Sequence, residues 1–221
     1  MPLQLHYWPI QGRVELLKMI CHYLKVQYEA VPVNSKEELP KRYEDVKPLL
    51  PNLPILVDGD VVVTQTIAIA AHIVNKGGDL TLFGNTPQDR VTVTMIIGHI
   101  GDITPMVFAM GKGDDDAKAA NRKNVETKLG QLENLLGDKT FFTGYVTVAD
   151  FVLLASSNLL NGGIKALWGY ELKDKFPGLE RCRSAVKELP GVKEYMNSDE
   201  HMKTPVIFPF MIGFKLESND H

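Results

Sequence analysis

Residues 51–66 read PNLPILVDGDVVVTQT, and this stretch decides the fold. Two apolar runs, ILV and VVV, flank the pair Asp58-Gly59, which is a strong signal for a turn between antiparallel strands. Pro54 precedes the first run, where a missing N–H takes nothing from the strand ladder, and its peptide bond is a candidate for the cis form. The stretch therefore predicts a β-hairpin that is entered through a proline turn.

The chain before the hairpin changes twice between strand and helix patterns. Residues 3–7 and 26–33 alternate apolar and polar side chains, whereas residues 13–23 repeat apolar positions every three or four residues. After the hairpin, a helical pattern begins near Gln65 and ends at Gly77-Gly78, where glycine can take a left-handed cap. This order resembles a thioredoxin-like α/β unit, whose first two strands run parallel through a helical crossover.

Beyond residue 85 the strand patterns vanish and helical patterns take over. We expect helices at residues 88–110, 117–136, 148–160 and 179–189, separated by glycine and proline. The sequence therefore predicts two domains, a thioredoxin-like domain at residues 1–80 and an all-helical domain at residues 86–221.

Composition places the chain among ordinary globular proteins, with 221 residues, 44% apolar and 23% charged. A net charge of −3 lacks the positive field that nucleic acid or an anionic membrane would require, so we expect neither as a partner. Cys21 and Cys182 are far apart and show no metal-ligand spacing, so no disulfide framework and no metal site are expected.

Neither a signal peptide nor a membrane span is expected. The first 20 residues carry polar and charged side chains throughout, without the apolar stretch of a signal peptide. The most apolar window, residues 91–110, is interrupted by Gly98, His99, Asp102 and Pro105, which suits a buried helix better than a lipid-facing one. We expect a cytoplasmic protein.

Tyr7 is the first candidate for chemistry, because it closes the first strand beside the turn at Gly12. A phenol can donate a hydrogen bond to a thiolate while staying protonated at neutral pH. Since the thiolate attacks electrophiles and the thiol does not, such a donor raises the reactive fraction. Taken alone, Tyr7 fits equally well a strand-end tyrosine that is anchored by its ring.

Two further features suit a peptide-like ligand with a carboxylate. Leu53, turned outward before Pro54, can pair through its backbone with a bound peptide as an added strand. Gln65 and Thr66 open a helix whose N–H groups and dipole favour an anion. The alternatives are an ordinary loop proline and plain helix capping by Thr64 or Thr66.

Together these motifs resemble the cytosolic glutathione S-transferases that use a tyrosine. The resemblance rests on Tyr7-Trp8, Gly12-Arg13 with Glu15, the PNLPILVDG loop, and Gln65-Thr66. In the second half, VTVADF at residues 146–151 is similar to the family's buried capping box, in which Thr147 caps a helix and Asp150 caps back. Residues 12–17 look like the sigma class, which includes the haematopoietic prostaglandin D synthase, and residues 51–58 look like the mu class.

The resemblance implies glutathione as co-substrate, with Tyr7 as the catalytic residue that holds its thiolate. It implies that Leu53 pairs with the cysteinyl backbone ahead of a cis Pro54, and that Gln65 and Thr66 bind the γ-glutamyl carboxylate. The full glutathione set is Tyr7, Trp8, Arg13, Tyr43, Lys47, Asn52, Leu53, Pro54, Gln65, Thr66 and Asp102.

Four members of that set have other implied roles. Lys47, with Tyr43 one helical turn before it, matches the pair that holds the glycine carboxylate, although the family usually has tryptophan where Tyr43 stands. Arg13 matches an arginine near the thiol, where its charge favours the anion. Asp102 lies where the family presents an acid to the glutamyl ammonium of a neighbouring subunit, which implies a homodimer.

The acceptor pocket is expected to involve Trp8, Ile10, Thr104 and Met106, with core packing as the alternative for Met106. The apolar tail from Pro205 to Phe214 either covers this pocket as a lid or docks on the helical domain.

The resemblance implies a detoxification enzyme that conjugates glutathione to hydrophobic electrophiles. Three alternatives stay open: a glutathione-dependent isomerase of the prostaglandin D synthase type, a carrier of hydrophobic ligands, and a structural relative without catalysis. A thioredoxin-type disulfide oxidoreductase would need a cysteine at the start of the first helix, and Cys21 lies deep inside that helix.

Overall fold

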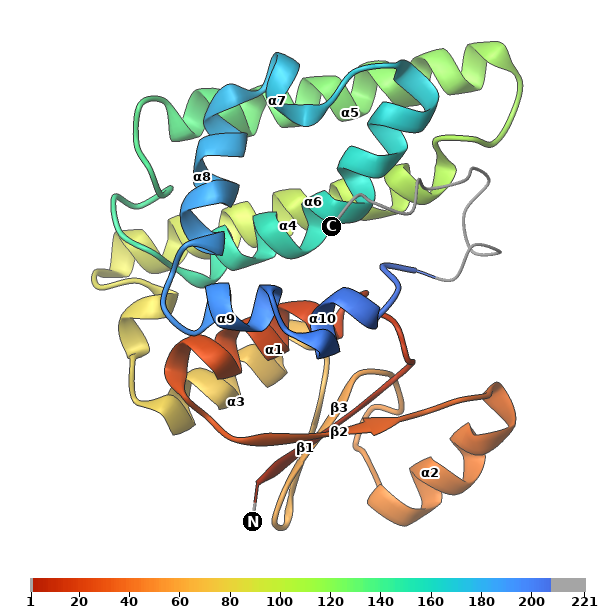
Figure 1. Cartoon of the computed structure of the whole chain (residues 1–221), viewed down its shortest axis with the longest axis vertical. Coiled ribbons are helices and arrows are strands. Elements are labelled where there is room, and N and C mark those ends of the chain that lie inside the picture. Colours follow the sequence, from red (N-terminus) through yellow and green to blue (C-terminus); the bar gives the residue numbers. More distant parts are fainter. Residues whose placement is uncertain (1, 208–221) are drawn as a thin grey trace. The chain divides into compact units, whose positions relative to one another are not determined.

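The computed structural model describes residues 2–207, and Figure 1 shows their course through the fold. The chain forms two compact units. The first contains the chain up to Leu80 together with Leu189–Pro205, and the second is built around Thr81–Glu188. A thioredoxin-like unit is thus followed by a helical one, as the sequence predicts.

The first unit is centred on a four-stranded sheet of order β2-β1-β3-β4. Its strands are β1 (Leu3–Tyr7), β2 (Tyr28–Pro32), β3 (Ile55–Asp58) and β4 (Val61–Thr64). β1 runs parallel to β2 and antiparallel to β3, which pairs antiparallel with β4. Asp58 pairs with Val61, so the turn consists of Gly59 and Asp60 rather than of Asp58 and Gly59.

Helices cover both faces of this sheet (Figure 1). The helices α1 (Val14–Leu24) and α3 (Thr66–Gly77) pack against each other on one side. Their apolar stripes, including Leu17, Ile20 and Ile73, are completely buried, because side chains three or four residues apart share one helical face. The hydrophobic effect on this face therefore fixes the sheet against the two helices.

The other face is covered by α2 (Leu39–Val46), which follows the short 3-10 helix η1 (Lys36–Glu38). Leu39, Tyr43 and Val46 of α2 pack on a small core made of Val33, Leu53 and Ile55. Only this stripe is apolar in an otherwise charged stretch, so the sequence analysis did not assign a helix here.

Residues 189–205 return to the first unit, although the sequence analysis placed them in the helical domain. They form α9 (Val192–Met196) and α10 (Asp199–Lys203), which lie beside α1 in Figure 1. Val192 and Tyr195 of α9 are buried there.

The second unit contains α4 (Pro87–Ala109), α5 (Asp115–Leu136), α6 (Val148–Trp168), α7 (Leu172–Lys175) and α8 (Pro177–Lys187), preceded by the 3-10 helix η2 (Leu80–Phe83). α6 packs against both α4 and α8. It continues beyond the predicted end at residue 160, because Gly162 and Gly163 are buried and tertiary packing outweighs their low helix propensity.

The start of α6 carries the expected capping box. The Asp150 carboxylate accepts hydrogen bonds from the Thr147 N–H at 2.7 Å and from the Phe142 N–H at 3.0 Å. Thr147 and Asp150 are completely buried, so every one of these donors would otherwise lack a partner. The box therefore joins the start of α6 to the chain before it.

Within the described part of the chain, α4 alone is long and apolar enough to cross a membrane, with a mean hydropathy of 1.4 over 18 residues. Its buried residues Val93, Ile96, Ile100, Ile103 and Val107 recur at threes and fours. This stripe faces α5 and α6, as in the core helix of a globular domain.

Candidate active site

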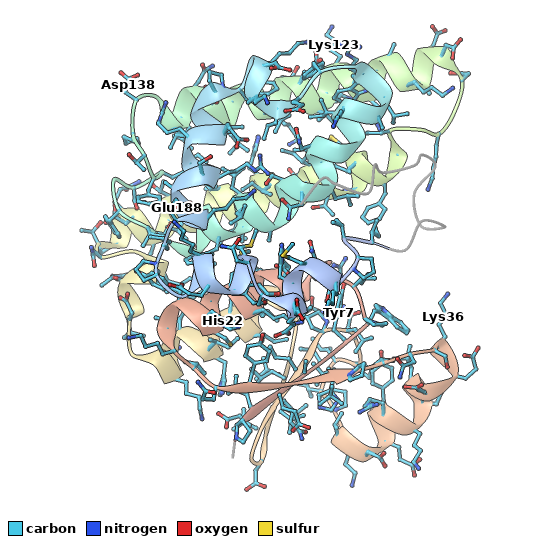
Figure 2. All side chains as sticks on the ribbon, viewed as in Figure 1. Tyr7, His22, Lys36, Lys123, Asp138 and Glu188 are labelled. Atoms are coloured by element: carbon cyan, nitrogen blue, oxygen red, sulfur yellow. The ribbon has the colours of Figure 1, made fainter. Side chains whose placement is uncertain are left out.

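Tyr7 stands at the carboxyl end of β1, facing the loop that leads into α1 (Figure 2). Its hydroxyl oxygen accepts a hydrogen bond of 3.1 Å from the backbone N–H of Arg13. Gly12 adopts φ +43°, and a Cβ there would lie only 2.8 Å from that oxygen. The close approach of loop and phenol therefore depends on glycine at residue 12.

Electrostatics keep the Tyr7 phenol protonated at neutral pH. Burial raises its pKa above the ordinary value, while the Arg13 N–H and the Arg13 charge oppose part of that rise. Among the described residues, no group accepts a hydrogen bond from the Tyr7 hydroxyl, so its proton is available to a ligand. The phenol is thus a prepared hydrogen-bond donor.

The amino end of α3 forms a second part of the site. Gln65 precedes the helix with φ +70° and ψ 117°, and no side chain caps the first turn. Neither Thr64 nor Thr66 caps this helix start, so the alternative to ligand binding is not observed. The uncapped N–H groups of the first turn and the positive end of the helix dipole favour a carboxylate.

The Leu53-Pro54 peptide bond is cis, as the sequence predicts. The expectation that Leu53 turns outward is wrong for its side chain, which is only 6% exposed and packs with Val33 and Ile55. An apolar residue at this point fills the core under α2, because the sheet face would otherwise be open to water. The Leu53 N–H donates to the Asn52 side-chain oxygen at 3.0 Å.

Tyr43 and Lys47 lie one turn apart at the end of α2. The Lys47 N–H donates to the Tyr43 carbonyl at 2.9 Å, and Lys47 takes the left-handed conformation with φ +49°. The Lys47 side chain is exposed, while Tyr43 and Trp8 pack against the small core beneath α2. The first unit thus brings Tyr7, Trp8 and Tyr43 to one cluster.

The remaining predicted residues have their own surroundings. Ile10 is 3% exposed and belongs to the core of the first unit. In the second unit, Asp102 on α4 forms an ion pair of 3.1 Å with Lys128, the Thr104 hydroxyl donates to the Ile100 carbonyl at 3.5 Å, and Met106 is half-buried. The tail from Phe208 onward lies outside the described residues.

Cys21 does not supply a reactive thiolate. It is completely buried on α1, and burial raises its pKa to about 12. A disulfide oxidoreductase activity at this residue is therefore not supported.

Gln11 and Glu15 are polar groups in the site region to which the sequence analysis gave no role. Both are 2% exposed, although they flank the exposed Arg13. Their partners lie about 180 residues away in the sequence, so no local pattern could reveal their burial. Glu15 belongs to the motif on which the family resemblance rests, and this is the sequence signal that could have pointed to it.

The chain thus consists of a thioredoxin-like unit, which carries Tyr7, a cis-proline loop and the start of α3, followed by a helical unit. Two family descriptions match the chain: Glutathione S-transferase, N-terminal domain, over residues 3–75, and Glutathione S-transferase, C-terminal domain, over residues 102–199. The chain belongs to the glutathione S-transferase family and is an enzyme with glutathione as its co-substrate.

Relatives of two kinds are similar over nearly the whole chain. A class-mu 26 kDa glutathione S-transferase of Fasciola hepatica is 30% identical over 213 residues, covering 93% of each chain. The hematopoietic prostaglandin D synthase of Gallus gallus is 28% identical over 202 residues, covering 87% of this chain and 94% of that protein.

Solved structures show the same two kinds of neighbour. The glutathione S-transferase Blo t 8 matches with a TM-score of 0.78 and 26% identity, covering 95% of this chain and 99% of that one. Rat hematopoietic prostaglandin D synthase in complex with a quinoline matches with a TM-score of 0.70 and 25% identity, covering 93% and 98%.

Proposed function

We propose that the chain conjugates glutathione to hydrophobic electrophiles, with Tyr7 as the residue that stabilises the glutathione thiolate. The observation that carries this proposal is the 3.1 Å hydrogen bond from the Arg13 N–H to the Tyr7 oxygen. It polarises the phenol and leaves its proton for a sulfur anion. The thiol proton leaves to solvent or a base, the thiolate attacks the electrophilic atom, and the displaced group, a halide in the assay below, leaves with the electron pair of the broken bond.

The rest of the tripeptide would be held by the residues around Tyr7. The uncapped start of α3, at Gln65 and Thr66, suits the γ-glutamyl carboxylate. The backbone of Leu53, ahead of Pro54, suits the cysteinyl backbone once its N–H leaves the Asn52 side-chain oxygen. Lys47, with its exposed ammonium beside Tyr43, suits the glycine carboxylate.

The test is the rate of glutathione addition to a chromogenic aryl halide for wild type and Tyr7→Phe. We expect Tyr7→Phe to lose roughly 10²-fold in kcat, the usual scale for one catalytic hydrogen-bond donor, while calorimetry shows glutathione still bound. Tyr145→Phe is the matched control, because Tyr145 donates to Asp89 in the second unit. Unchanged turnover in Tyr7→Phe would contradict the proposed role.

A glutathione-dependent isomerase is the second candidate, because two relatives are prostaglandin D synthases. It uses the same thiolate and releases it at the end of the reaction, so the Tyr7 site supports both. Incubation with a prostaglandin endoperoxide and glutathione distinguishes them: rearranged product without glutathione consumption indicates isomerisation. Binding of hydrophobic ligands without either reaction would instead indicate the carrier or structural alternative.

We also propose a cytoplasmic detoxification enzyme that works as a homodimer. Several large apolar side chains are exposed on the isolated chain, namely Leu49 (92%), Leu50 (59%), Val91 (61%) and Met95 (56%). Such exposure suits a subunit interface. Asp102 would then reach the glutamyl ammonium of the neighbouring subunit's ligand by leaving Lys128.

Sedimentation velocity tests the homodimer. We expect wild type to sediment as a dimer and Leu50→Glu or Met95→Glu to shift it toward monomer, because a charge buried in an apolar interface is costly. Met202→Glu is the control, since Met202 is 54% exposed on a different helix, α10. A monomeric wild type would contradict the proposal.

A further inference from the structure

The segment from Tyr195 to Pro205 binds the loop that connects β1 to α1. Gln11, in that loop, is 2% exposed and donates three hydrogen bonds, all to this segment. Its N–H donates to the Pro205 carbonyl at 2.8 Å. Its side-chain Nε2 donates to the carbonyls of Thr204 at 3.1 Å and His201 at 3.3 Å.

Glu15 makes a second connection on the other side of Arg13. Its carboxylate lies in the first turn of α1 and is 2% exposed. Oε1 accepts from His201 Nδ1 at 2.7 Å, and Oε2 accepts from the Tyr195 hydroxyl at 2.9 Å. A buried carboxylate is costly without partners, and here the distant segment supplies a partner for each oxygen.

Gln11 and Glu15, which both bind the distant segment, lie on either side of Arg13 in the sequence, and Arg13 contacts the Tyr7 phenol. Arg13 lies two residues after Gln11 and two before Glu15, and its N–H reaches the Tyr7 oxygen at 3.1 Å. Hydrogen bonds weaken steeply when their geometry changes, so a small movement of this loop would remove the donor from Tyr7. The distant segment therefore holds the loop where that bond requires it.

We propose that Gln11, Glu15 and His201 are positioning residues for the transferase reaction, which hold the Arg13 N–H against Tyr7. The inference rests on the proposed role of Tyr7. It makes the segment Tyr195–Pro205 part of the catalytic apparatus, although the segment contributes no group that touches the thiol. Without the Arg13 hydrogen bond, the Tyr7 phenol is a weaker donor and less of the bound glutathione is thiolate at neutral pH.

The test measures the titration of enzyme-bound glutathione by the ultraviolet absorbance of its thiolate, beside the pH profile of kcat/KM. We expect Gln11→Met and His201→Leu to move both midpoints upward by about one pH unit, which is about tenfold less thiolate on the acidic side. The rates should converge with wild type at high pH. His201→Asn, which keeps a donor near the position of Nδ1, should bring the midpoints most of the way back to their wild-type values.

Lys18→Met is the matched control for a role in stability alone. Lys18 forms an ion pair of 2.7 Å with Glu200, so it also ties α1 to α10, but within the described residues its ammonium makes no hydrogen bond or ion pair with Gln11, Glu15 or Arg13. We expect this variant to lower the melting temperature without moving the thiolate titration. Gln11→Met keeps the backbone bond to Pro205, so it should stay folded if the variants of the buried His201 do not.

Three outcomes decide the inference. A shift in Gln11→Met or His201→Leu with none in Lys18→Met supports it. No shift in a folded Gln11→Met, or an equal shift in Lys18→Met, overturns it while Tyr7→Phe still shifts the titration. If Tyr7→Phe itself leaves the titration unchanged, the proposed role of Tyr7 fails and the positioning role fails with it.

Discussion

Gly12 and Tyr7 approach each other more closely than any side chain at residue 12 would allow. A Cβ at Gly12 would lie 2.8 Å from the Tyr7 oxygen and 3.0 Å from its ring. The left-handed backbone at φ +43° adds a second reason for glycine. At the scale of single residues, the proposed role of Tyr7 therefore requires a residue without a Cβ at position 12.

We expect Gly12→Ala to lower kcat/KM by at least tenfold, because the new methyl group would push the loop away from Tyr7. Gly59→Ala is its control, since Gly59 has φ +60° but no atom within 4 Å of the added Cβ. Both variants should lose about 1 kcal/mol of stability from the backbone conformation. Activity is assayed beside thermal unfolding. Equal activity in the two variants would show that a Cβ at residue 12 does not disturb the contact with Tyr7.

Sequence patterns point to a candidate site residue only where neighbouring residues in the sequence mark it. Tyr7 at a strand end, Pro54 before an apolar run and Gln65 before a helix each stand in a recognisable context within ten residues. Gln11 and Glu15 do not, because their burial results from partners near residue 200. The outward turn assigned to Leu53 was wrong for the same reason, since its side chain is covered by α2.

At the scale of elements, strong hydrophobic periodicity predicts the strands and helices correctly, whereas weak periodicity leaves short helices undetected. The strands and the long helices α1, α3, α4 and α5 match their predicted ranges closely. Short helices such as α2, α9 and α10 were not assigned. Each shows one or two turns of a pattern and forms because tertiary contacts stabilise its few apolar or paired residues.

The capping box of α6 provides the prediction at this scale. Asp150→Ala should lower the free energy of unfolding by about 3 kcal/mol, because the N–H groups of Thr147 and Phe142 would lose their acceptor inside the core. Asp89→Ala is the control, because it removes the capping box of α4, which lies in exposed surroundings, and should cost about 1 kcal/mol. Urea unfolding of the two variants measures the difference, and equal losses would show that burial of Asp150 adds nothing.

At the scale of the whole molecule, the two units do not follow the order of the sequence. The first unit takes its last two helices from residues 189–205, which follow Thr81–Glu188 of the second unit. The change in sequence pattern near residue 85 indicates where the strands end. It does not indicate that residues 189–205 belong to the first unit. The return depends on pairs such as Tyr195 with Glu15, which only the folded chain brings together.

Hydrogen exchange with and without glutathione tests this division. We expect bound glutathione to slow amide exchange in residues 1–80 and also in residues 189–205, because both ranges fold as one unit and a ligand stabilises the unit it binds. Amides of α5, in the second unit, serve as the internal control and should change less. If α9 and α10 instead respond like α5, they do not share the stability of the first unit.

The return of residues 189–205 also has a consequence for biosynthesis. A ribosome makes the β-strands, Tyr7 and the start of α3 first, and the carbonyls that fix Gln11 and the imidazole that pairs with Glu15 follow only at residues 201–205. A nascent chain halted before residue 190 lacks these partners, so its Tyr7 loop is unsupported. The proposed activation of glutathione through Tyr7 would therefore reach its full strength only after residues 195–205 have been made.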